Sequence, residues 1–322
     1  MIDAVTERRR ILVVAGPTGV GKTRVAVALA RELDAEIVSA DSMQVYRGMD
    51  IGTSKATAEE RAAAPHHMLD VVDPDEDFHA ARYRELATAA LADIHSRGRR
   101  AILVGGTGLY IKILVRGIFE APPVDQDLRG RYEQEAETYG SGALHDRLKL
   151  VDPLLAGRVN PNDRVRVIRA LEVFDLTGIP LSQHQEAHGF ADALYDTLTL
   201  GLRIDRAVLY ERIEARVDQM LASGFADEVR RLLQAGFSAD LRPMGALGYK
   251  QLCAQLSGEL TEEEAIRRIK RETKRYAKRQ LTWFQKDPAV RWFEEPFDVP
   301  AMAGLAAEHF EGANLPPIEA AP

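Results

Sequence analysis

The segment Gly16-Pro17-Thr18-Gly19-Val20-Gly21-Lys22-Thr23 follows an apolar run, Ile11 to Ala15, and precedes a helix-like segment that ends near Leu33. Its G-x-x-x-x-G-K-[ST] spacing, between a strand and an amphipathic helix, is typical of a phosphate-binding loop. Backbone N–H groups, the helix N-terminus and Lys22 suit a diphosphate or triphosphate, and the Thr23 hydroxyl suits magnesium. The segment therefore predicts a polyphosphate ligand. It does not choose among a kinase, a hydrolase and a transferase that releases pyrophosphate.

The composition is typical of a globular protein. At 322 residues with 46% apolar content, the chain can bury one large core or two smaller ones. Apolar runs stay far below the ~18 residues of a membrane helix, and the run at Ile11 is too short for a secretory signal. We therefore expect a cytoplasmic protein with no membrane association. The single cysteine, Cys253, excludes an internal disulfide framework and a cysteine-based zinc module.

Positive charge is concentrated in one element of an otherwise acidic chain. The formal net charge is −7, but nine Lys or Arg and one Glu lie between Arg267 and Lys286. This imbalance indicates a polyanionic partner, although a solvated charged helix is the alternative. A capping box formed by Thr261 and Glu264 predicts where the helix begins, and Asp287-Pro288 predicts where it ends. We expect an inward stripe of Ile266, Ile269, Thr273, Tyr276, Gln280 and Trp283, with Arg267, Arg271, Lys274, Arg275 and Lys278 facing away.

Strand and helix patterns alternate over the first third of the chain. A strand from Glu36 to Asp41, a helix from Ala80 to Gly98 and a strand from Ala101 to Gly106 follow the phosphate loop. This alternation predicts an α/β fold with a parallel sheet and helices on both faces. Ligands should gather at the carboxyl ends of the strands.

The alternation stops at Ala121-Pro122-Pro123. Residues 121–194 contain only helical patterns, so we expect an inserted all-helical subdomain. The strand Thr197 to Ile204 returns to the sheet, and Asp205 caps a helix that carries Arg212 and Arg216 on one face. We therefore expect a core domain of residues 1–120 and 195–310, which includes a last strand at 290–294. Residues 311–322 are expected to be disordered.

Three further segments carry candidate functional groups. Asp41 follows the second strand, where it could support magnesium, act as a general base, or cap a turn. Thr107 offers a hydroxyl in the Gly-rich turn GGTGLY, which has only part of a dinucleotide fingerprint, so we reject a nicotinamide site. His66, His67 and Asp70 in PHHMLD could bind a metal. The segment has no third strong ligand nearby, which favours a structural role.

Taken together, these segments resemble the tRNA dimethylallyltransferases, also called the IPP transferase family, in the compact bacterial form. The matching segments are GPTGVGKT, DSMQVYRGMDIGT, PHHMLD, GGTGLY, RVIRALEV, LGYK and TKRYAKRQLTWF, in the order of the family and spread over residues 16–284. The resemblance implies a P-loop NTPase-like sheet and transfer of a dimethylallyl group from dimethylallyl diphosphate to tRNA. The acceptor would be the exocyclic amine of the adenosine 3′-adjacent to the anticodon, and pyrophosphate would be released.

The resemblance also implies roles for individual residues. The loop from Gly16 to Thr23 would bind the diphosphate, with Thr23 holding the magnesium cofactor. The expected catalytic residues are Asp41 as the base, Thr107 at the target nucleotide and Arg216 at the diphosphate. The residues expected to contact the tRNA anticodon stem-loop are Asp41, Ser42, Met43, Gln44, Thr107, Arg129, Arg166, Arg169, Lys274, Arg275 and Lys278. We expect a monomer.

The chain departs from the family pattern at two places. Gly19-Val20 stands where Ala-Ser or Ala-Val is common, and RPMGALGYK matches only loosely before Gly248. Two other functions compete with prenyl transfer. A small-molecule or nucleotide kinase explains the loop and the sheet but leaves the basic helix without a role. A non-catalytic RNA-binding protein with a nucleotide switch would use both features and modify no RNA.

Overall fold

A computed structural model describes residues 8–117, 119, 121–189 and 194–313 of the chain. The chain divides into two compact units. Unit 1 comprises Met1–Val115 with Leu194–Pro322, and unit 2 comprises Arg116–Ala193. No helix in the described ranges is long and apolar enough to cross a membrane.

Unit 1 is built on a six-stranded sheet in which every pairing is parallel, with the strand order β3-β2-β4-β1-β5-β6. The strands are β1 (Arg10–Ala15), β2 (Ala35–Ser39), β3 (His66–His67), β4 (Arg100–Gly105), β5 (Asp196–Arg203) and β6 (Val290–Glu294). The strand β1 is central, because Leu12 pairs with Ile102 on one side and Leu198 on the other. The predicted α/β fold with a parallel sheet is confirmed.

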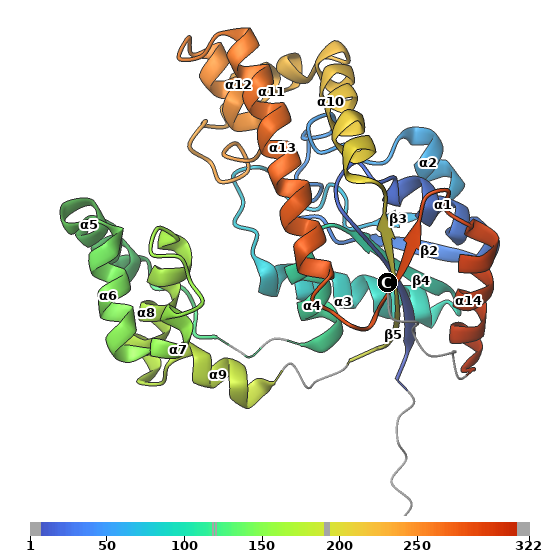
Figure 1. Ribbon diagram of the computed structural model, residues 1–322, viewed down its shortest axis with the longest axis horizontal. Helices are drawn as coiled ribbons and strands as arrows, with labels where there is room; N and C mark the ends of the chain where they lie inside the picture. Colours follow the sequence, from blue (N-terminus) through green and yellow to red (C-terminus); the bar gives the residue numbers. More distant parts are fainter. Residues whose placement is uncertain (1–7, 118, 120, 190–193, 314–322) are drawn as a thin grey trace, which may run out of the picture. The chain divides into compact units, whose positions relative to one another are not determined.

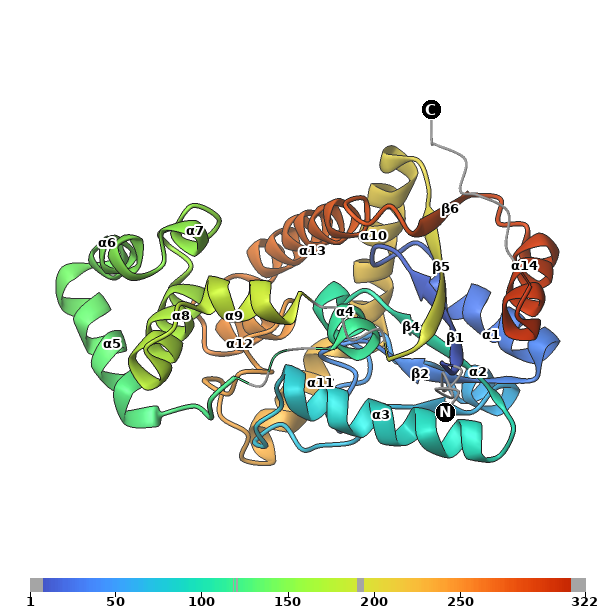
Figure 2. The ribbon, with the colours of Figure 1, turned by 90° about the horizontal axis from the view of Figure 1, so that it is seen from below.

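Helices cover both faces of this sheet, as parallel strands require. The helices of this part of the chain are α1 (Lys22–Leu33), α2 (Ala58–Ala63), α3 (Ala80–Ser96), α4 (Gly108–Arg116), α10 (Arg206–Ala222), α11 (Phe225–Gln234), α12 (Tyr249–Leu256), α13 (Glu262–Phe284) and α14 (Val299–Glu311). In both Figure 1 and Figure 2, α14 lies beside α1 and α10 lies beside α13. The sequence patterns had not predicted α14. The expected disordered tail began too early at residue 311, because α14 extends to Glu311. The described chain ends at Ala313, so residues 314–322 of that tail lie outside it.

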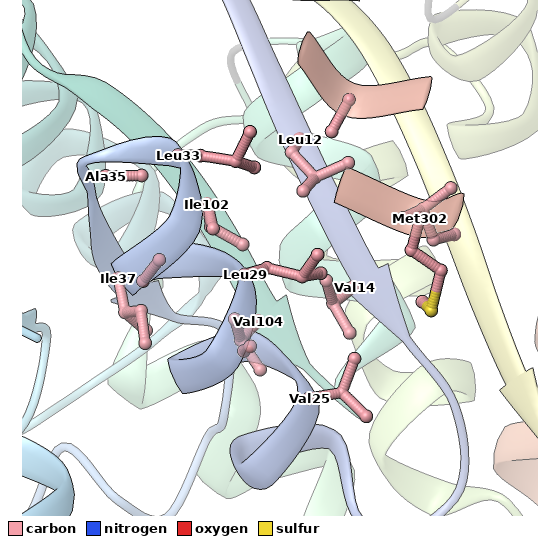
Figure 3. Close-up of a cluster of buried hydrophobic side chains, with 14 of the residues drawn as sticks. Leu12, Val14, Val25, Leu29, Leu33, Ala35, Ile37, Ile102, Val104 and Met302 are labelled. Carbon is pink, nitrogen blue, oxygen red and sulfur yellow. The ribbon is translucent and has the colours of Figure 1, made fainter. Parts of the chain in front are cut away.

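The main core packs α1 and α14 against one face of the sheet. Leu12 and Val14 of β1, Leu29 of α1 and Met302 of α14 meet there (Figure 3), and each of these residues is fully buried. On α3, Tyr83 and the residues at helical spacing after it are also buried, and the Tyr83 hydroxyl donates to the Ser39 carbonyl at 3.0 Å. Burial on both faces holds the strand ends, and therefore the loops that follow them, in fixed positions.

Unit 2 consists of helices, and its described residues form no strand. They are α5 (Gln126–Tyr139), α6 (Ser141–Val151), α7 (Pro153–Ala156), α8 (Arg164–Thr177) and α9 (Leu181–His188). Leu144, Leu148 and Leu171 are fully buried within the unit's own apolar core. The predicted helical insertion is confirmed.

Two details of α13 differ from the prediction. Thr261 caps the helix, because its side chain accepts from the Glu264 N–H at 3.2 Å, but the Glu264 carboxylate pairs with Arg267 and Arg268 instead of completing a capping box. The prediction that Lys274 faces away from the protein is also wrong, since its ammonium pairs with Glu214 on α10. Arg267 and Arg268 compete for the Glu264 carboxylate at i,i+3 and i,i+4 spacing on the same helix. Glu214 lies on another helix, so its pairing with Lys274 was not visible from the α13 pattern alone.

The buried stripe of α13 is shifted relative to the predicted one. Ile269 and Gln280 are buried as expected, together with Ala277 and Phe284. Trp283 is 44% exposed, although its indole lies against Gly108 so closely that a Cβ there would be 2.1 Å from Nε1. The helix therefore packs along a line that includes small and polar residues.

Candidate functional site

Three loops converge at the carboxyl edge of the sheet because they follow the neighbouring strands β2, β4 and β1. Thr107 Oγ1 accepts from the Ser42 N–H at 3.2 Å, and the Thr107 N–H donates to the Ala40 carbonyl at 3.2 Å. A Cβ on Gly105 would lie 2.1 Å from the Ala40 carbonyl oxygen. Only glycine permits this approach, which places Asp41 and Thr107 close together at the same edge of the sheet.

The phosphate loop between β1 and α1 is held in a turn that uses two left-handed glycines. Gly19 has φ +84° and Gly21 has φ +98°. The extra glycine at position 19 therefore occupies a conformation that alanine adopts only with strain. The Lys22 ammonium donates to the Pro17 carbonyl at 2.8 Å, so it closes over the loop. The backbone N–H groups of such a loop and the N-terminus of α1 are an arrangement that suits an anion.

Arg216 reaches the phosphate loop from α10. Its Nε donates to Ser54 Oγ at 2.9 Å, and its Nη1 lies 3.4 Å from Thr18 Oγ1. Burial, helped by the nearby positive charge of Arg216, lowers the pKa of Lys22 to about 8, while Asp41 opposes this change. Burial also lowers the pKa of Arg216, again opposed by Asp41. Two half-buried cations near one another favour an anionic ligand between them.

Asp41 uses one carboxylate oxygen in a turn. Its Oδ1 accepts from the Met43 N–H at 2.8 Å and the Gln44 N–H at 3.3 Å. Its Oδ2 accepts no hydrogen bond from the residues that the structure describes, and Asp41 lines the main cavity. The turn and general-base interpretations of Asp41 are therefore compatible, because each needs a different oxygen.

A cavity of about 350 Å³ extends from the phosphate loop into unit 1. Its polar end contains Thr18, Asp41 and Arg216. Its other walls include the apolar side chains Ile213, Val217, Met220, Phe225, Leu247 and Ile269. An anion site that opens onto an apolar chamber suits a ligand with a diphosphate head and a short hydrocarbon tail.

Helix α13 contributes residues to which the sequence gave no functional role. Gln280 Oε1 accepts from the Thr18 N–H at 2.8 Å, and its Nε2 donates to the Gly106 carbonyl at 3.0 Å. Gln280 thus joins the loops that follow β1 and β4. Burial and the charge of Asp41 raise the pKa of Tyr276 to about 12, against a hydrogen bond with Thr107. A glutamine on the inward stripe of the helix was the available signal.

Comparisons with known proteins agree with this geometry. Residues 44–287 match the sequence model described as IPP transferase. The chain belongs to the IPP transferase family. A tRNA dimethylallyltransferase of Geobacter sulfurreducens is 52% identical over 94% of this chain and 97% of that protein. Another, from Pelobacter propionicus, is 54% identical over 89% of this chain and 93% of its own length.

Solved structures of this family have the same fold. A tRNA isopentenylpyrophosphate transferase from Bacillus halodurans is 42% identical, with a TM-score of 0.69 over 95% of this chain and 97% of that one. A eukaryotic dimethylallyltransferase described as acting on tRNA is 27% identical, with a TM-score of 0.80 over 95% of this chain and 81% of that one. This chain therefore shares its P-loop-like fold with solved members of the family over most of its length.

The residues around Thr23 suit magnesium. Thr23 lines a second cavity of about 30 Å³ together with Ser39, Gln44 and His66. In the described ranges, no group of three His, Cys, Asp or Glu side chains could hold a metal by itself. Magnesium typically takes one or two protein oxygens and completes its shell with phosphate and water. The Thr23 hydroxyl beside an anion site fits that pattern.

The PHHMLD segment makes structural contacts. His66 Nδ1 lies 2.8 Å from the Ala64 carbonyl, and His67 Nε2 lies 2.8 Å from Glu36 Oε2. The Asp70 carboxylate pairs with Lys55 and Arg61, which hold its pKa below the usual value despite burial. The three side chains turn toward different partners, which fits the structural role that the sequence favoured.

The residues expected to contact tRNA differ in how they are placed. Arg129 and Arg169 both pair with Glu172, a fully buried carboxylate of unit 2, whereas Arg166 is largely exposed near Asp163. Gln44 donates to the carbonyls of Thr53 and Ser54 at 3.1 and 3.2 Å. On α13, the exposed residues of the expected set are Arg275 and Lys278.

We predict that the affinity of this IPP transferase for inorganic pyrophosphate falls as the pH rises above 8. Lys22 carries its charge below its pKa of about 8 and loses it above that pH. A bound anion favours the charged form, so each pH unit above 8 should weaken binding by up to about tenfold. Titration calorimetry from pH 6.5 to 9.5 measures this change.

The matched control is Lys22→Arg, because arginine stays protonated across this range. Its affinity should follow only the ionisation of pyrophosphate itself. A ratio of the two dissociation constants that stays constant from pH 7 to 9.5 would show that Lys22 does not titrate at the site.

Proposed function

We propose that this protein transfers a dimethylallyl group from dimethylallyl diphosphate to the exocyclic amine of the adenosine 3′-adjacent to the anticodon of tRNA. Pyrophosphate is the second product. The observation that carries the proposal is the single cavity that joins the phosphate loop, an apolar chamber and the Asp41 carboxylate. The relatives named as tRNA dimethylallyltransferases over almost the whole chain support it.

The diphosphate head would lie on the N–H groups of the phosphate loop, with Lys22 and Arg216 on either side. As the bond from the prenyl C1 to the bridging oxygen breaks, its electron pair passes to the diphosphate. The two half-buried cations would stabilise that charge without reorganising, because Lys22 is already held by Pro17 and Arg216 by Ser54. Bound through the Thr23 hydroxyl, magnesium would supply further Lewis-acid charge to the leaving group.

The nucleophile is an exocyclic amine that loses a proton as the carbon–nitrogen bond forms. Asp41 Oδ2 is the acceptor we propose, since Oδ1 is held by two backbone N–H groups that fix the carboxylate in place. Thr107 and Tyr276 adjoin Asp41 and would orient the adenine of the target nucleotide. The adenosine must leave its stack to reach this position, which is easiest in a single-stranded anticodon loop.

A small-molecule or nucleotide kinase is not favoured. It would use the phosphate loop but would leave the apolar half of the cavity without a ligand. The curated relatives are also named as transferases of a dimethylallyl group.

Incubation of the protein with unmodified tRNA and dimethylallyl diphosphate tests the proposal. We expect mass analysis of the nucleosides to show a five-carbon addition to adenosine, with an equal amount of pyrophosphate released. Formation of a phosphorylated product or of ADP from ATP, with unchanged tRNA, would support the kinase instead. Nucleotide binding that changes RNA affinity without modifying the RNA would support the switch protein.

We predict that Asp41→Asn slows the chemical step by roughly 10² to 10⁴, the usual contribution of a positioned general base. The asparagine oxygen can still accept from the Met43 and Gln44 N–H groups, so the turn should survive while the basic Oδ2 is removed. Single-turnover rates with both substrates saturating, measured over a magnesium series, check this. Recovery of the parent rate at high magnesium would make Asp41 a metal-supporting residue.

We predict that Arg275→Glu with Lys278→Glu weakens tRNA binding and flattens its salt dependence. Both side chains are exposed on α13, and removal of each interaction with a tRNA phosphate should change the log–log slope by about 0.7 to 0.9. Filter binding from low to moderate salt measures the slope. Arg31→Glu reverses an exposed arginine on α1, changes the net charge by half as much, and should keep the parent slope. If the α13 double variant and Arg31→Glu give equal slopes, the exposed charges of α13 are only solvated and do not contact tRNA.

A further inference from the structure

A buried carboxylate on α11 binds the loop that follows Met49. Glu228 is only 3% exposed and accepts four hydrogen bonds. Its Oε2 accepts from the Asp50 and Ile51 N–H groups at 2.9 and 2.7 Å. Its Oε1 accepts from the Gly52 N–H at 3.1 Å and from the Tyr249 hydroxyl at 2.7 Å. One side chain therefore fixes three consecutive peptide groups.

The same loop forms a wall of the cavity. Gly52, Thr53 and Ser54 line it, and a Cβ on Gly52 would lie 2.2 Å from the Phe225 ring. Glycine at this position lets the loop pack directly on α11, within reach of the Glu228 carboxylate. The loop cannot move toward α11 without a clash, and it cannot move away without breaking the hydrogen bonds to Glu228.

The peptide groups held by Glu228 build the turn that presents Ser54. The Ser54 N–H donates to the Ile51 carbonyl at 3.0 Å, and the Lys55 N–H donates to the Asp50 carbonyl at 3.1 Å. Ser54 has φ +51°, a left-handed conformation that a non-glycine residue keeps only when its surroundings hold it there. Its Oγ then accepts from Arg216 Nε at 2.9 Å.

We propose that Glu228 is a positioning residue for Arg216. It fixes the turn from Asp50 to Ser54 and, through Ser54 Oγ, aims the guanidinium at the phosphate loop. Because the anchor is a carboxylate, it accepts all four hydrogen bonds at once. A glutamine could keep only those made to its single oxygen and would leave buried N–H groups without a partner. This inference rests on the proposed role of Arg216 at the diphosphate.

The chain offers a matched control for a purely structural role. Glu36 on β2 is likewise 3% exposed, and its carboxylate pairs with Arg97 and His67. Neither partner lines the main cavity. Glu36→Gln therefore removes an equally buried carboxylate from the same unit without touching the wall at Ser54.

The experiment is a double-mutant cycle between Glu228→Gln and Ser54→Ala, read out as the dissociation constant of inorganic pyrophosphate. We expect each single variant to weaken pyrophosphate binding by about tenfold, the scale of one hydrogen bond to a charged group. The double variant should be no weaker than Glu228→Gln alone, because both changes release the same guanidinium. The affinity for tRNA should stay within about twofold of the parent, since neither change alters an exposed cation.

Three outcomes overturn the inference. One is a double variant whose loss of pyrophosphate affinity equals the product of the two single losses. Another is a Glu228→Gln variant that, like Glu36→Gln, only lowers the melting temperature and keeps the parent pyrophosphate affinity. The third is an equal loss of tRNA and pyrophosphate binding, which would indicate general disruption.

Tyr249→Phe keeps the carboxylate but removes one of its four partners, so it serves if Glu228→Gln does not fold. Tyr249→Phe should weaken pyrophosphate binding less than Glu228→Gln does. Combined with Ser54→Ala, it should cause no further loss beyond that of Ser54→Ala alone.

Arg216→Gln separates this inference from the proposed function. If Arg216→Gln leaves pyrophosphate affinity unchanged, the proposed role of Arg216 fails and the inference with it. If Arg216→Gln weakens binding but the cycle is additive, only the inference fails.

Discussion

The close approach of Gly105 to the Ala40 carbonyl is the constraint on which the site depends. A Cβ at Gly105 would lie 2.1 Å from that oxygen, so any other residue would push β2 and β4 apart at their carboxyl ends. The same Ala40 accepts from the Thr107 N–H and donates to the Val104 carbonyl at 2.7 Å. Asp41 and Thr107 are therefore neighbours because of backbone packing, before any side chain contributes.

Two positively charged side chains, Lys22 and Arg216, lie near each other at the phosphate loop. Lys22 and Arg216 are both buried enough to have lowered pKa values, and each is held by neutral oxygen atoms, the Pro17 carbonyl and the Ser54 hydroxyl. Two cations this close repel each other, and a diphosphate relieves that repulsion. In the function we propose, the diphosphate leaving group would supply the negative charge that these two side chains lack in the free protein.

Local patterns were enough to predict the phosphate loop, the parallel sheet, the helical insertion and the strand ends that carry Asp41 and Thr107. Each of these depends on residues close in sequence or on the rule that parallel strands share a carboxyl edge. The links made by Gln280 and Glu228 were not predictable in this way. Gln280 bonds to Thr18 across 262 positions, and Glu228 bonds to Asp50 across 178. A single polar residue on an amphipathic helix does not reveal which distant backbone it will meet.

The central claim is that the phosphate loop holds the leaving group of a carbon transfer and not a phosphoryl group in transit. The most direct measurement uses dimethylallyl diphosphate labelled with oxygen-18 at the oxygen that bridges C1 and phosphorus. The account predicts cleavage between carbon and oxygen, so mass analysis should find the entire label in the released pyrophosphate and none in the tRNA. Label retained in prenyl alcohol, with the diphosphoryl group passed to an acceptor or to water, would place the cleavage between phosphorus and the bridging oxygen and contradict the account.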